Sequence, residues 1–440
     1  MDFVRSIGRW ALAGLVINCI IGSGIFGIPA ELTRRLGRAS PLAMIAAGLA
    51  MATIMVSYAE VASQFSEAGG SYLYVRTAFG RFAGLQIGWF WLLSVLGGGA
   101  ASANLFITYL AGVFPVAGHG WARAAILTAL IAIPVAANYR GVRAGADVSS
   151  VLTVAKLAPL GVLIALGVWR FGHAAQMIHP AEISGSSWTS WAEAMLLVSF
   201  AYQGFEDAVV PAGEVKNPRR SVPFAIFTGL IVCMAAYTLL QFVVVATIGS
   251  QASDRPLGAV AAVLLGPGGE TFLAVAVMLS AYGYISASIL NAPRLGSAFA
   301  ENGDGPTPLG NLHPRYHTPG RAILLYAALL WLLALTGTFL WALAIAVGAS
   351  TIYYAGVCAS LIQLRRTRPN ADALRIPWGP AWAVAGIAFS LLLLTQMDAR
   401  EAMLMMVTAA IAAANWWWAK RRVSNTETDV SMPAPTGNQN

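Results

Sequence analysis

Long apolar runs separated by short polar segments occur along the whole chain. Runs with at most two charged residues cover 11–30, 40–59, 82–115, 124–139, 148–169, 194–213, 222–250, 271–293, 322–364, 376–397 and 402–419. A membrane-spanning helix needs roughly 20 apolar residues, so the run 322–364 is long enough for two and is expected to turn at 336–338. The pattern predicts an all-α membrane protein with about 12 transmembrane helices.

Two of these runs are interrupted near their middle by polar, glycine-rich residues. The first interruption is GSGIFG at 22–27, and the second is AYQGFED at 201–207. A helix that breaks inside a membrane leaves backbone N–H and C=O groups without partners, and lipid cannot satisfy them. Paired discontinuous helices are typical of the substrate site of a secondary transporter.

The first interruption predicts a site for a carboxylate. Glycine tolerates irregular dihedral angles, so Gly22 and Gly24 allow the helix to unwind. The N–H groups of Ser23, Gly24 and Ile25 then lie at the start of a half-helix, where the helix dipole favours negative charge. The alternative is that these glycines only allow close packing of neighbouring helices.

The second interruption predicts the opposite polarity. The carbonyl groups of Phe200, Ala201 and Gln203 precede Gly204 and lie at the end of a half-helix. Exposed carbonyls at that end attract a cation such as an ammonium group. One break suits an acid group and the other suits an amine, so together they predict a zwitterionic amino acid as the substrate.

The chain also shows a repeat on the scale of five helices. Segments 9–170 and 190–364 each open with a broken span, and an odd number of helices inverts the second segment in the membrane. We expect residues 1–364 to form a transporter core and 376–419 to form two accessory transmembrane helices. Residues 423–440 are polar and are expected to form a disordered cytoplasmic tail. The segment 64–81 is expected at the inner membrane interface, and 301–319 as a cytoplasmic linker.

Composition and charge refine this picture. The 440 residues are 58% hydrophobic and 10% charged, whereas a soluble domain carries about 25% charged residues, so a soluble scaffold is excluded. Most Lys and Arg residues fall in loops on the side of the N-terminus, which indicates that both termini are cytoplasmic in a plasma or inner membrane. The arginines at 34, 35 and 38 run against this rule. The net charge of +8 is thus a signal of orientation, and no nucleic acid partner is expected.

Ionisable residues inside the spans are candidates for function. Lys156 lies near the middle of its run, where a buried ammonium is costly, so we expect it to exchange a proton or to occupy the place of a sodium ion. The alternative is that its side chain snorkels to the interface. Glu206 is expected to be a carboxylate that takes up a proton or senses the substrate. The alternative is that Glu206 and Asp207 face water or cap the second half-helix. Glu60 is expected to pair with a basic residue. The three cysteines and five histidines show no spacing for a disulfide, a metal site or another cofactor.

Three motifs in order carry a resemblance to a known family. The segments IIGSGIFGIPA at 20–30, YAEVASQFSEAGGSYLYV at 58–75 and FAYQGFEDAVVPAGEVKNPRRSVP at 200–223 resemble amino acid permeases of the amino acid–polyamine–organocation (APC) superfamily. The resemblance implies the LeuT-like 5+5 inverted repeat, with discontinuous helices 1 and 6, and alternating access.

The resemblance also implies roles for individual residues. The substrate carboxylate and amine would bind at the two breaks, and the substrate-binding candidates are Ile21, Gly22, Ser23, Gly24, Ile25, Phe200, Ala201, Gln203 and Gly204. Phe200 matches the aromatic gate of the family. Lys156 matches a lysine that replaces sodium, and Glu206 matches a glutamate of proton dependence in the arginine/agmatine branch. That branch has tryptophan where this chain has Phe200, which argues against an arginine/agmatine activity.

The sequence therefore predicts a secondary active transporter, either a proton-coupled symporter or an exchanger of neutral amino acids. Its expected partners are an amino acid, protons and the lipid bilayer, with no sodium and no cofactor. One alternative is a permease or antiporter for cationic amino acids or polyamines, which Glu206 and Asp207 favour and Lys156 opposes by charge repulsion. A membrane-embedded enzyme or a transporter-derived receptor is a further alternative, although the spans offer no catalytic constellation and the chain shows no soluble output domain.

Overall fold

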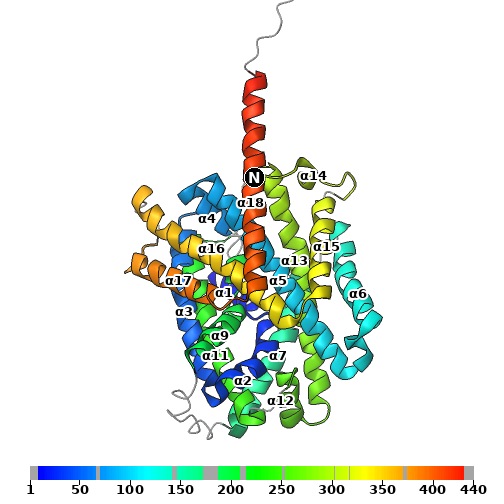
Figure 1. Cartoon of the computed structure of the whole chain (residues 1–440). Helices are drawn as coiled ribbons and strands as arrows, with labels where there is room; N and C mark the ends of the chain where they lie inside the picture. Colours follow the sequence, from blue (N-terminus) through cyan, green and yellow to red (C-terminus); the bar gives the residue numbers. More distant parts are fainter. Residues whose placement is uncertain are drawn as a thin grey trace, which may run out of the picture.

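The fold is built from helices (Figure 1). The computed structural model describes residues 8–65, 70–140, 146–171, 187–208, 215–249, 253–301, 303–316, 318–369 and 374–430. Within these ranges every regular element is a helix. Lipid offers no hydrogen-bond partners, so the backbone groups of the apolar runs must pair within the protein. An α-helix pairs them within each run.

The helices of the N-terminal half follow the predicted runs closely. They are α1 (Arg9–Ile20), α2 (Gly24–Leu36), α3 (Ser40–Ala62), α4 (Gly70–Phe79), α5 (Arg81–Val113), α6 (Gly120–Tyr139) and α7 (Ala146–Phe171). The run predicted at 11–30 is divided between α1 and α2, with residues 21–23 between them. The first predicted interruption is therefore present in the structure.

The C-terminal half contains the second interruption. Its helices are α9 (Trp188–Ala201), α10 (Phe205–Ala208), α11 (Pro218–Ile248), α12 (Pro256–Leu265), α13 (Gly269–Glu301), α14 (Thr307–Gly310), α15 (Gly320–Thr336), α16 (Phe339–Thr367), α17 (Gly379–Leu394) and α18 (Ala399–Val430). Residues 202–204 separate α9 from α10. The predicted turn at 336–338 is confirmed, because the Thr338 side chain accepts the N–H of Trp341 at 3.3 Å and so caps α16.

Several of these helices have the length and apolar composition of membrane spans. Among the described residues seven qualify: Gly24–Ala62, Arg81–Val113, Gly120–Tyr139, Arg219–Ile248, Gly269–Gly296, Phe339–Thr367 and Ala399–Arg421. Shorter apolar helices occur at Arg9–Ile20, Pro256–Leu265, Gly320–Thr336 and Gly379–Leu394. A run divided by a break or a turn can leave one piece too short to count, as α1 and α15 are.

Helix α5 lies at the centre of the bundle and packs against α16, α13 and α4. Three consecutive glycines allow this approach. A Cβ on Gly97 would lie 2.8 Å from the Ala342 carbonyl oxygen in α16, and a Cβ on Gly98 would lie 2.4 Å from the Tyr284 hydroxyl oxygen in α13. Small residues at helix contacts are a common device of membrane bundles, because helices in lipid gain stability from close van der Waals packing.

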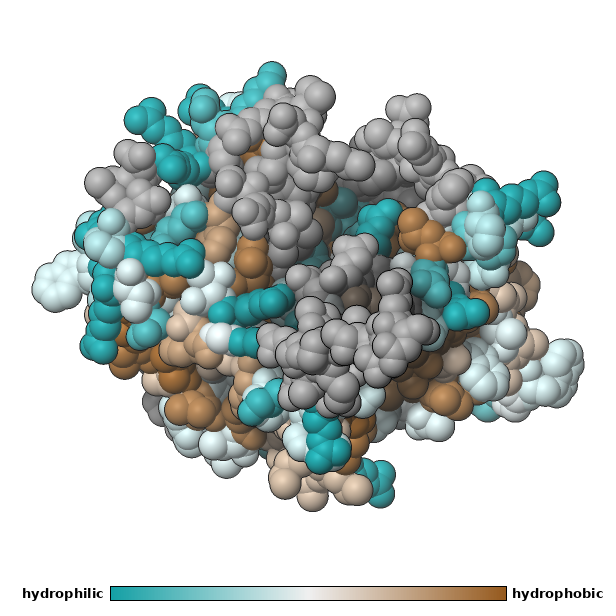
Figure 2. All heavy atoms as spheres, turned by 90° about the horizontal axis from the view of Figure 1, so that it is seen from above, coloured by the Kyte–Doolittle hydropathy of each residue, from teal (hydrophilic) through white to brown (hydrophobic). Residues whose placement is uncertain are grey.

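One end of the bundle carries α4, α14 and the outer part of α18 (Figure 1). The view onto that end shows hydrophilic side chains spread across the face, with hydrophobic ones along its lower margin (Figure 2). The segment expected as a linker at 301–319 is anchored here. Asp304 is fully buried, pairs with Arg81 and accepts a hydrogen bond from the Tyr72 hydroxyl at 3.0 Å, while Asn415 donates to its carbonyl at 2.7 Å.

Two boundaries differ from the sequence-based expectation. Helix α12 was not predicted, because ten residues closed by Gly266 are too short to give the pattern of a span. Helix α18 continues to Val430, although a tail was expected from 423; residues 431–440 lie outside the described residues.

Candidate functional site

The first break frees the end of α1 by redirecting its backbone hydrogen bonds. In an unbroken helix the N–H of Gly22 would bond to the Asn18 carbonyl. Here the Gly22 N–H bonds to the Ile20 carbonyl at 2.8 Å instead. Helix α2 then restarts at Gly24, and the N–H groups of its first turn have no carbonyl within α2 to receive them. The break therefore presents carbonyls from α1 and amides from α2.

The second break has a tighter geometry. After α9 ends at Ala201, the N–H groups of Tyr202 and Gln203 fold back onto the carbonyls of Ser199 and Phe200 at 3.2 and 3.3 Å. Gly204 then takes φ +100°, a conformation that glycine adopts easily and other residues rarely adopt. The N–H of Gly204 bonds to Glu206 Oε2 at 3.0 Å, so Glu206 satisfies one donor at the start of the short helix α10.

The two breaks lie against each other. A Cβ on Gly204 would lie 2.4 Å from the Cys19 carbonyl oxygen, and a Cβ on Gly24 would lie 3.1 Å from Ala201 Cα. A side chain at Gly204 would clash with backbone, and one at Gly24 would need its neighbours to shift. The glycines in both motifs thus allow the backbone of one interrupted helix to approach that of the other.

Tyr237 of α11 ties the two breaks together. Its hydroxyl lies 3.0 Å from the Ile20 carbonyl and 2.9 Å from the Ala201 carbonyl, at the ends of α1 and α9. A hydroxyl has one proton to donate, so it serves one carbonyl at a time. Its ring is buried, with 1% of its surface exposed. Sequence reasoning missed this residue, since only the fold brings α11 to both breaks.

A small central cavity lies between the breaks. It holds about 30 Å³ and is lined by Gly22, Ser23, Gly24, Phe200, Gln203, Gly204, Glu206 and Asp207, together with Trp91, Ser94, Tyr284, Tyr353 and other residues. This volume has room for about one water molecule. The helices must therefore move before an amino acid can occupy the central cavity.

Most of the predicted substrate-binding residues line this central cavity, but three do not. Ile21 and Ile25 are buried in the hydrophobic core, with 4% and 0% of their surfaces exposed. Ala201 is also buried, and its carbonyl accepts the Tyr237 hydroxyl. Ser23 and Gln203 have side-chain partners at 2.9 Å and 2.7 Å, which are Ser102 and Ser350.

A second cavity adjoins the first. This side cavity holds about 180 Å³ and is lined by residues of α1, α5, α7, α13 and the second break, including Lys156 and Asp207. Lys156 Nζ donates to the Asn18 carbonyl at 2.5 Å. That carbonyl is the one that the first break freed from Gly22, so the ammonium of Lys156 takes the place of a lost helical hydrogen bond.

Glu206 lies in an aromatic cluster on the side of the breaks toward α4. Its Oε1 accepts the hydroxyls of Tyr353 at 2.7 Å and Tyr354 at 2.9 Å. The rings of Tyr58, Phe205 and Tyr354 lie 5.1 to 5.7 Å apart and fill this side. The two tyrosines of α16 were missed from the sequence, although a tyrosine inside an apolar run usually needs a hydrogen-bond partner and could have indicated a polar site.

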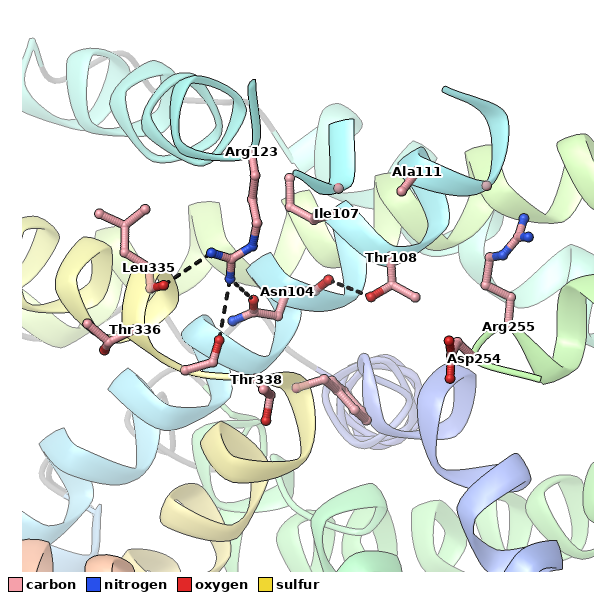
Figure 3. A pocket seen from close by; sticks show the side chains of 14 residues that line it. Asn104, Ile107, Thr108, Ala111, Arg123, Asp254, Arg255, Leu335, Thr336 and Thr338 are labelled. Carbon is pink, nitrogen blue, oxygen red and sulfur yellow. Dashed lines mark hydrogen bonds between the residues drawn. The ribbon is translucent and has the colours of Figure 1, made fainter. Parts of the chain in front are cut away.

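A third cavity lies at the opposite end of α5. This end cavity holds about 640 Å³ between α5, α6, the α15–α16 turn and the start of α12. Arg123 points into the α15–α16 turn and donates to the Leu335 carbonyl at 3.1 Å and to Asn104 Oδ1 at 2.7 Å, while Asp254 and Arg255 lie across from it (Figure 3). The Phe339 ring lines the end cavity and lies close to Gly27 of α2.

Comparison with known proteins identifies the family. A family profile described as "Amino acid permease" matches residues 7–420. The serine/threonine exchanger SteT of Bacillus subtilis is 27% identical over 412 residues, which cover 89% of this chain and 90% of that protein. The arginine/agmatine antiporter of Chlamydia pneumoniae is 27% identical over 421 residues, covering 89% and 85%. An uncharacterized transporter of Mycobacterium tuberculosis is 28% identical over 366 residues, covering 82% and 80%.

The family and these relatives are transporters and not enzymes, so the alternative of a membrane-embedded enzyme is excluded. The several long apolar helices of the described residues agree with a membrane transporter. The match of the family profile extends over both helix breaks and both neighbouring cavities. The chain is an integral membrane protein that belongs to the amino acid permease family of the APC superfamily.

Proposed function

We propose that this protein is a secondary active transporter of neutral amino acids that works by alternating access, as a proton-coupled symporter or an exchanger. The observation that carries the proposal is the contact between two broken helices across one small polar cavity. Amides at the start of α2 suit a carboxylate, and carbonyls at the ends of α1 and α9 suit an ammonium. An α-amino acid carries both groups on one carbon.

The binding mode follows from the hydrogen bonds at the breaks. The carboxylate is assigned to the backbone N–H groups of Ser23, Gly24 and Ile25, with Gly22 beside them, since the Gly22 N–H already bonds to the Ile20 carbonyl. The ammonium is assigned to the carbonyls of Phe200, Ala201 and Gln203, with Gly204 beside them. The carbonyls of Phe200 and Ala201 each already accept one hydrogen bond, from the Gln203 N–H and the Tyr237 hydroxyl, and each keeps a second lone pair for the ammonium. Phe200, whose ring edge lies next to Gly24, is assigned as the gate over this position.

The proposed fold is a LeuT-like 5+5 inverted repeat with about 12 spans, in which α1–α2 and α9–α10 are the discontinuous helices. The accessory spans are α17 and α18. The end of the bundle that carries α4 and α14 is assigned to the cytoplasm of a plasma or inner membrane, together with both termini. The excess of Lys and Arg in the loops on that side supports this orientation.

Coupling to protons is assigned to Lys156 and Glu206. The Lys156 ammonium already bonds to the carbonyl that a sodium ion would need at the end of α1, which supports a mechanism without sodium. Glu206 lies between the Gly204 amide of the second break and the tyrosines of α16, so a change of its charge would act on both. Proton transfer at either group would change the balance between conformations.

This conformation is assigned to a state in which the central cavity is closed on both sides. The packing of Phe339 against α2 toward the end cavity and of the rings around Tyr58 toward α4 supports the assignment. In the alternating-access cycle, movement of α2 away from Phe339 opens one side, and movement of α10 away from Tyr58 opens the other.

The test is uptake of radiolabelled amino acids into proteoliposomes that contain the purified protein, with and without a pH gradient. We expect saturable uptake of at least one neutral amino acid, and acceleration by an inward proton gradient if the protein is a symporter. An exchanger would instead need an amino acid inside the vesicles. The absence of saturable flux or exchange for all twenty amino acids would refute the proposal.

A second candidate is transport of cationic amino acids or polyamines. Asp207 and Glu206 both line the central cavity and favour it, whereas the ammonium of Lys156 in the adjoining side cavity opposes it. Competition of arginine, lysine and putrescine against the neutral substrate in the same vesicles separates the two candidates.

A further inference from the structure

The side cavity contains more hydrogen-bond acceptors than the protein itself satisfies. The carboxylate of Asp207 accepts one hydrogen bond in the described part of the chain, from Trp91 Nε1 at 3.3 Å. An ionised carboxylate can accept about four. Two further oxygens, Asn18 Oδ1 and Ser280 Oγ, are buried and have no partner among the described residues. All three residues line the side cavity.

Unpaired polar groups of this kind are costly in a membrane core. A buried acceptor without a donor loses its hydrogen bond to water, and no hydrogen bond within the protein replaces it. Two such groups, Asn18 Oδ1 and Ser280 Oγ, and the spare acceptor capacity of the Asp207 carboxylate around one hollow indicate that a ligand brings the missing donors. The side cavity shares Gly22, Gly204 and Asp207 with the central cavity, so a molecule held at the breaks can extend directly into it.

We propose that the side cavity receives the side chain of the substrate and selects neutral amino acids whose side chain donates a hydrogen bond, with Asp207 as the main acceptor. This proposal rests on the transport function proposed above. The selected side chains carry a hydroxyl or a carboxamide, as in serine, threonine, asparagine and glutamine. An aliphatic side chain of the same shape would leave the acceptors unpaired, and sites built around polar groups reject such analogues strongly.

Charge excludes the cationic side chains that Asp207 alone would attract. The Lys156 ammonium lines the same cavity, so the carboxylate and the ammonium leave the cavity with no net charge to attract a third ion. The volume of about 180 Å³ exceeds the space that one water occupies several-fold and accommodates side chains up to the size of a carboxamide.

The experiment compares isosteric substrates in proteoliposomes. Threonine and valine have the same shape and differ by the hydroxyl, and serine differs from alanine in the same way. We expect the wild-type protein to prefer threonine over valine by about tenfold to hundredfold in competition, the range of a hydrogen bond to a charged acceptor. In Asp207→Ala this ratio should fall below about threefold, and in Asp207→Asn, which keeps one acceptor oxygen, it should lie between the two.

A matched control is Ser390→Ala in α17, which removes another buried, unpartnered hydroxyl that does not line the side cavity. Its threonine-to-valine ratio should equal that of the wild type. If Asp207→Ala does not fold, Asp207→Asn and Ser280→Ala supply the same comparison, and both should lower the ratio. Melting curves of each purified variant in detergent establish that it is folded.

The outcomes separate this inference from the transport function. If the wild-type protein carries no amino acid, the proposed function itself fails. If it carries amino acids but takes valine as well as threonine, or if folded Asp207→Ala and Ser280→Ala keep the wild-type ratio, transport stands and the side cavity is not the selectivity site. A preference for arginine or lysine over threonine would also overturn the inference.

Discussion

Substitution of Gly204 by alanine tests the close contact between the two helix breaks. Gly204 has φ +100°, and an added Cβ would lie 2.4 Å from the Cys19 carbonyl oxygen. The methyl group therefore meets two obstacles at once. One is local, because a residue with a side chain rarely adopts this φ, and the other comes from the end of α1.

The size of the effect follows from both obstacles. A non-glycine residue in a disfavoured backbone region costs about 1–3 kcal/mol. Forcing a methyl group into a packed contact costs about another 1–3 kcal/mol when the neighbour is backbone that cannot rotate away. We expect Gly204→Ala to lose about 2–6 kcal/mol of stability, or else to separate the two breaks. Separated breaks would no longer hold the acid and amine groups of one substrate.

Two glycines of the first broken helix, α1–α2, provide graded controls. A Cβ on Gly24 would lie 2.9 Å from Phe200 Cδ1, a side-chain atom that can move, so Gly24→Ala should cost only about 1–2 kcal/mol. A Cβ on Gly14 would have no neighbour within 4 Å. Gly14→Ala should be neutral or stabilising by up to about 1 kcal/mol, because alanine is the better helix former.

The assay combines melting temperature in detergent with uptake into proteoliposomes. We expect Gly14→Ala to match the wild type in both, Gly24→Ala to show a raised KM, and Gly204→Ala to show at least a tenfold loss of uptake with a lower melting temperature. If Gly204→Ala melts and transports like Gly14→Ala, the breaks do not approach each other as described, and the binding mode built on them is wrong.

Three further substitutions test other contacts. Lys156→Ala should abolish or uncouple proton-driven uptake while the protein remains folded, because it removes the ammonium that holds the Asn18 carbonyl; uptake measured across a pH gradient checks this. Tyr237→Phe should lower stability by about 1–2 kcal/mol, because it removes the hydroxyl that bonds to the ends of two broken helices, as measured by melting in detergent. Arg365→Ala should cost about 3–5 kcal/mol, because it leaves the buried carboxylate of Glu60 without its bidentate partner at 2.5 and 2.7 Å.

Each of these predictions has an outcome that would contradict it, and the last two have a control variant. Lys156→Ala with an unchanged pH dependence would contradict the coupling role. Tyr282→Phe removes a hydroxyl that has no hydrogen bond among the described residues, so it should be milder than Tyr237→Phe; an equal loss would show that the bridging bonds contribute little. The double variant Glu60→Gln/Arg365→Met should be more stable than Arg365→Ala, since no unpaired charge is left; a double variant that is worse would argue that the pair stabilises the fold beyond charge compensation.

The local chain pattern predicted the features that depend on neighbouring residues. The breaks at residues 21–23 and 202–204 follow from glycines and polar residues inside apolar runs, because such residues weaken a helix wherever it packs. The turn at 336–338 follows for the same reason. The pairing of Glu60 with a basic residue was also predictable and is confirmed by Arg365, since a buried carboxylate in a span needs a partner.

The contacts that turn these features into a candidate site could not be predicted, because they join residues that are distant along the chain. Whether Gly204 faces the Cys19 carbonyl, whether Lys156 takes the carbonyl freed by the first break, and which tyrosines hold Glu206 all depend on how the helices pack. The pattern of apolar residues indicates that a helix is buried, but it does not indicate which helix it packs against. In lipid, the pairing of helices depends on how well their surfaces fit together and not on hydrophobicity.

The sequence by itself therefore determined where two of the spans break and where the run 322–364 turns, since local backbone preferences and the need to satisfy every amide in lipid decide this. Only the tertiary structure decided that the two breaks touch, that Tyr237 bridges them, and that Asp207 faces a cavity with unpaired acceptors. Those contacts arise from the packing of α1, α9, α11 and α13, and packing is a property of the whole bundle.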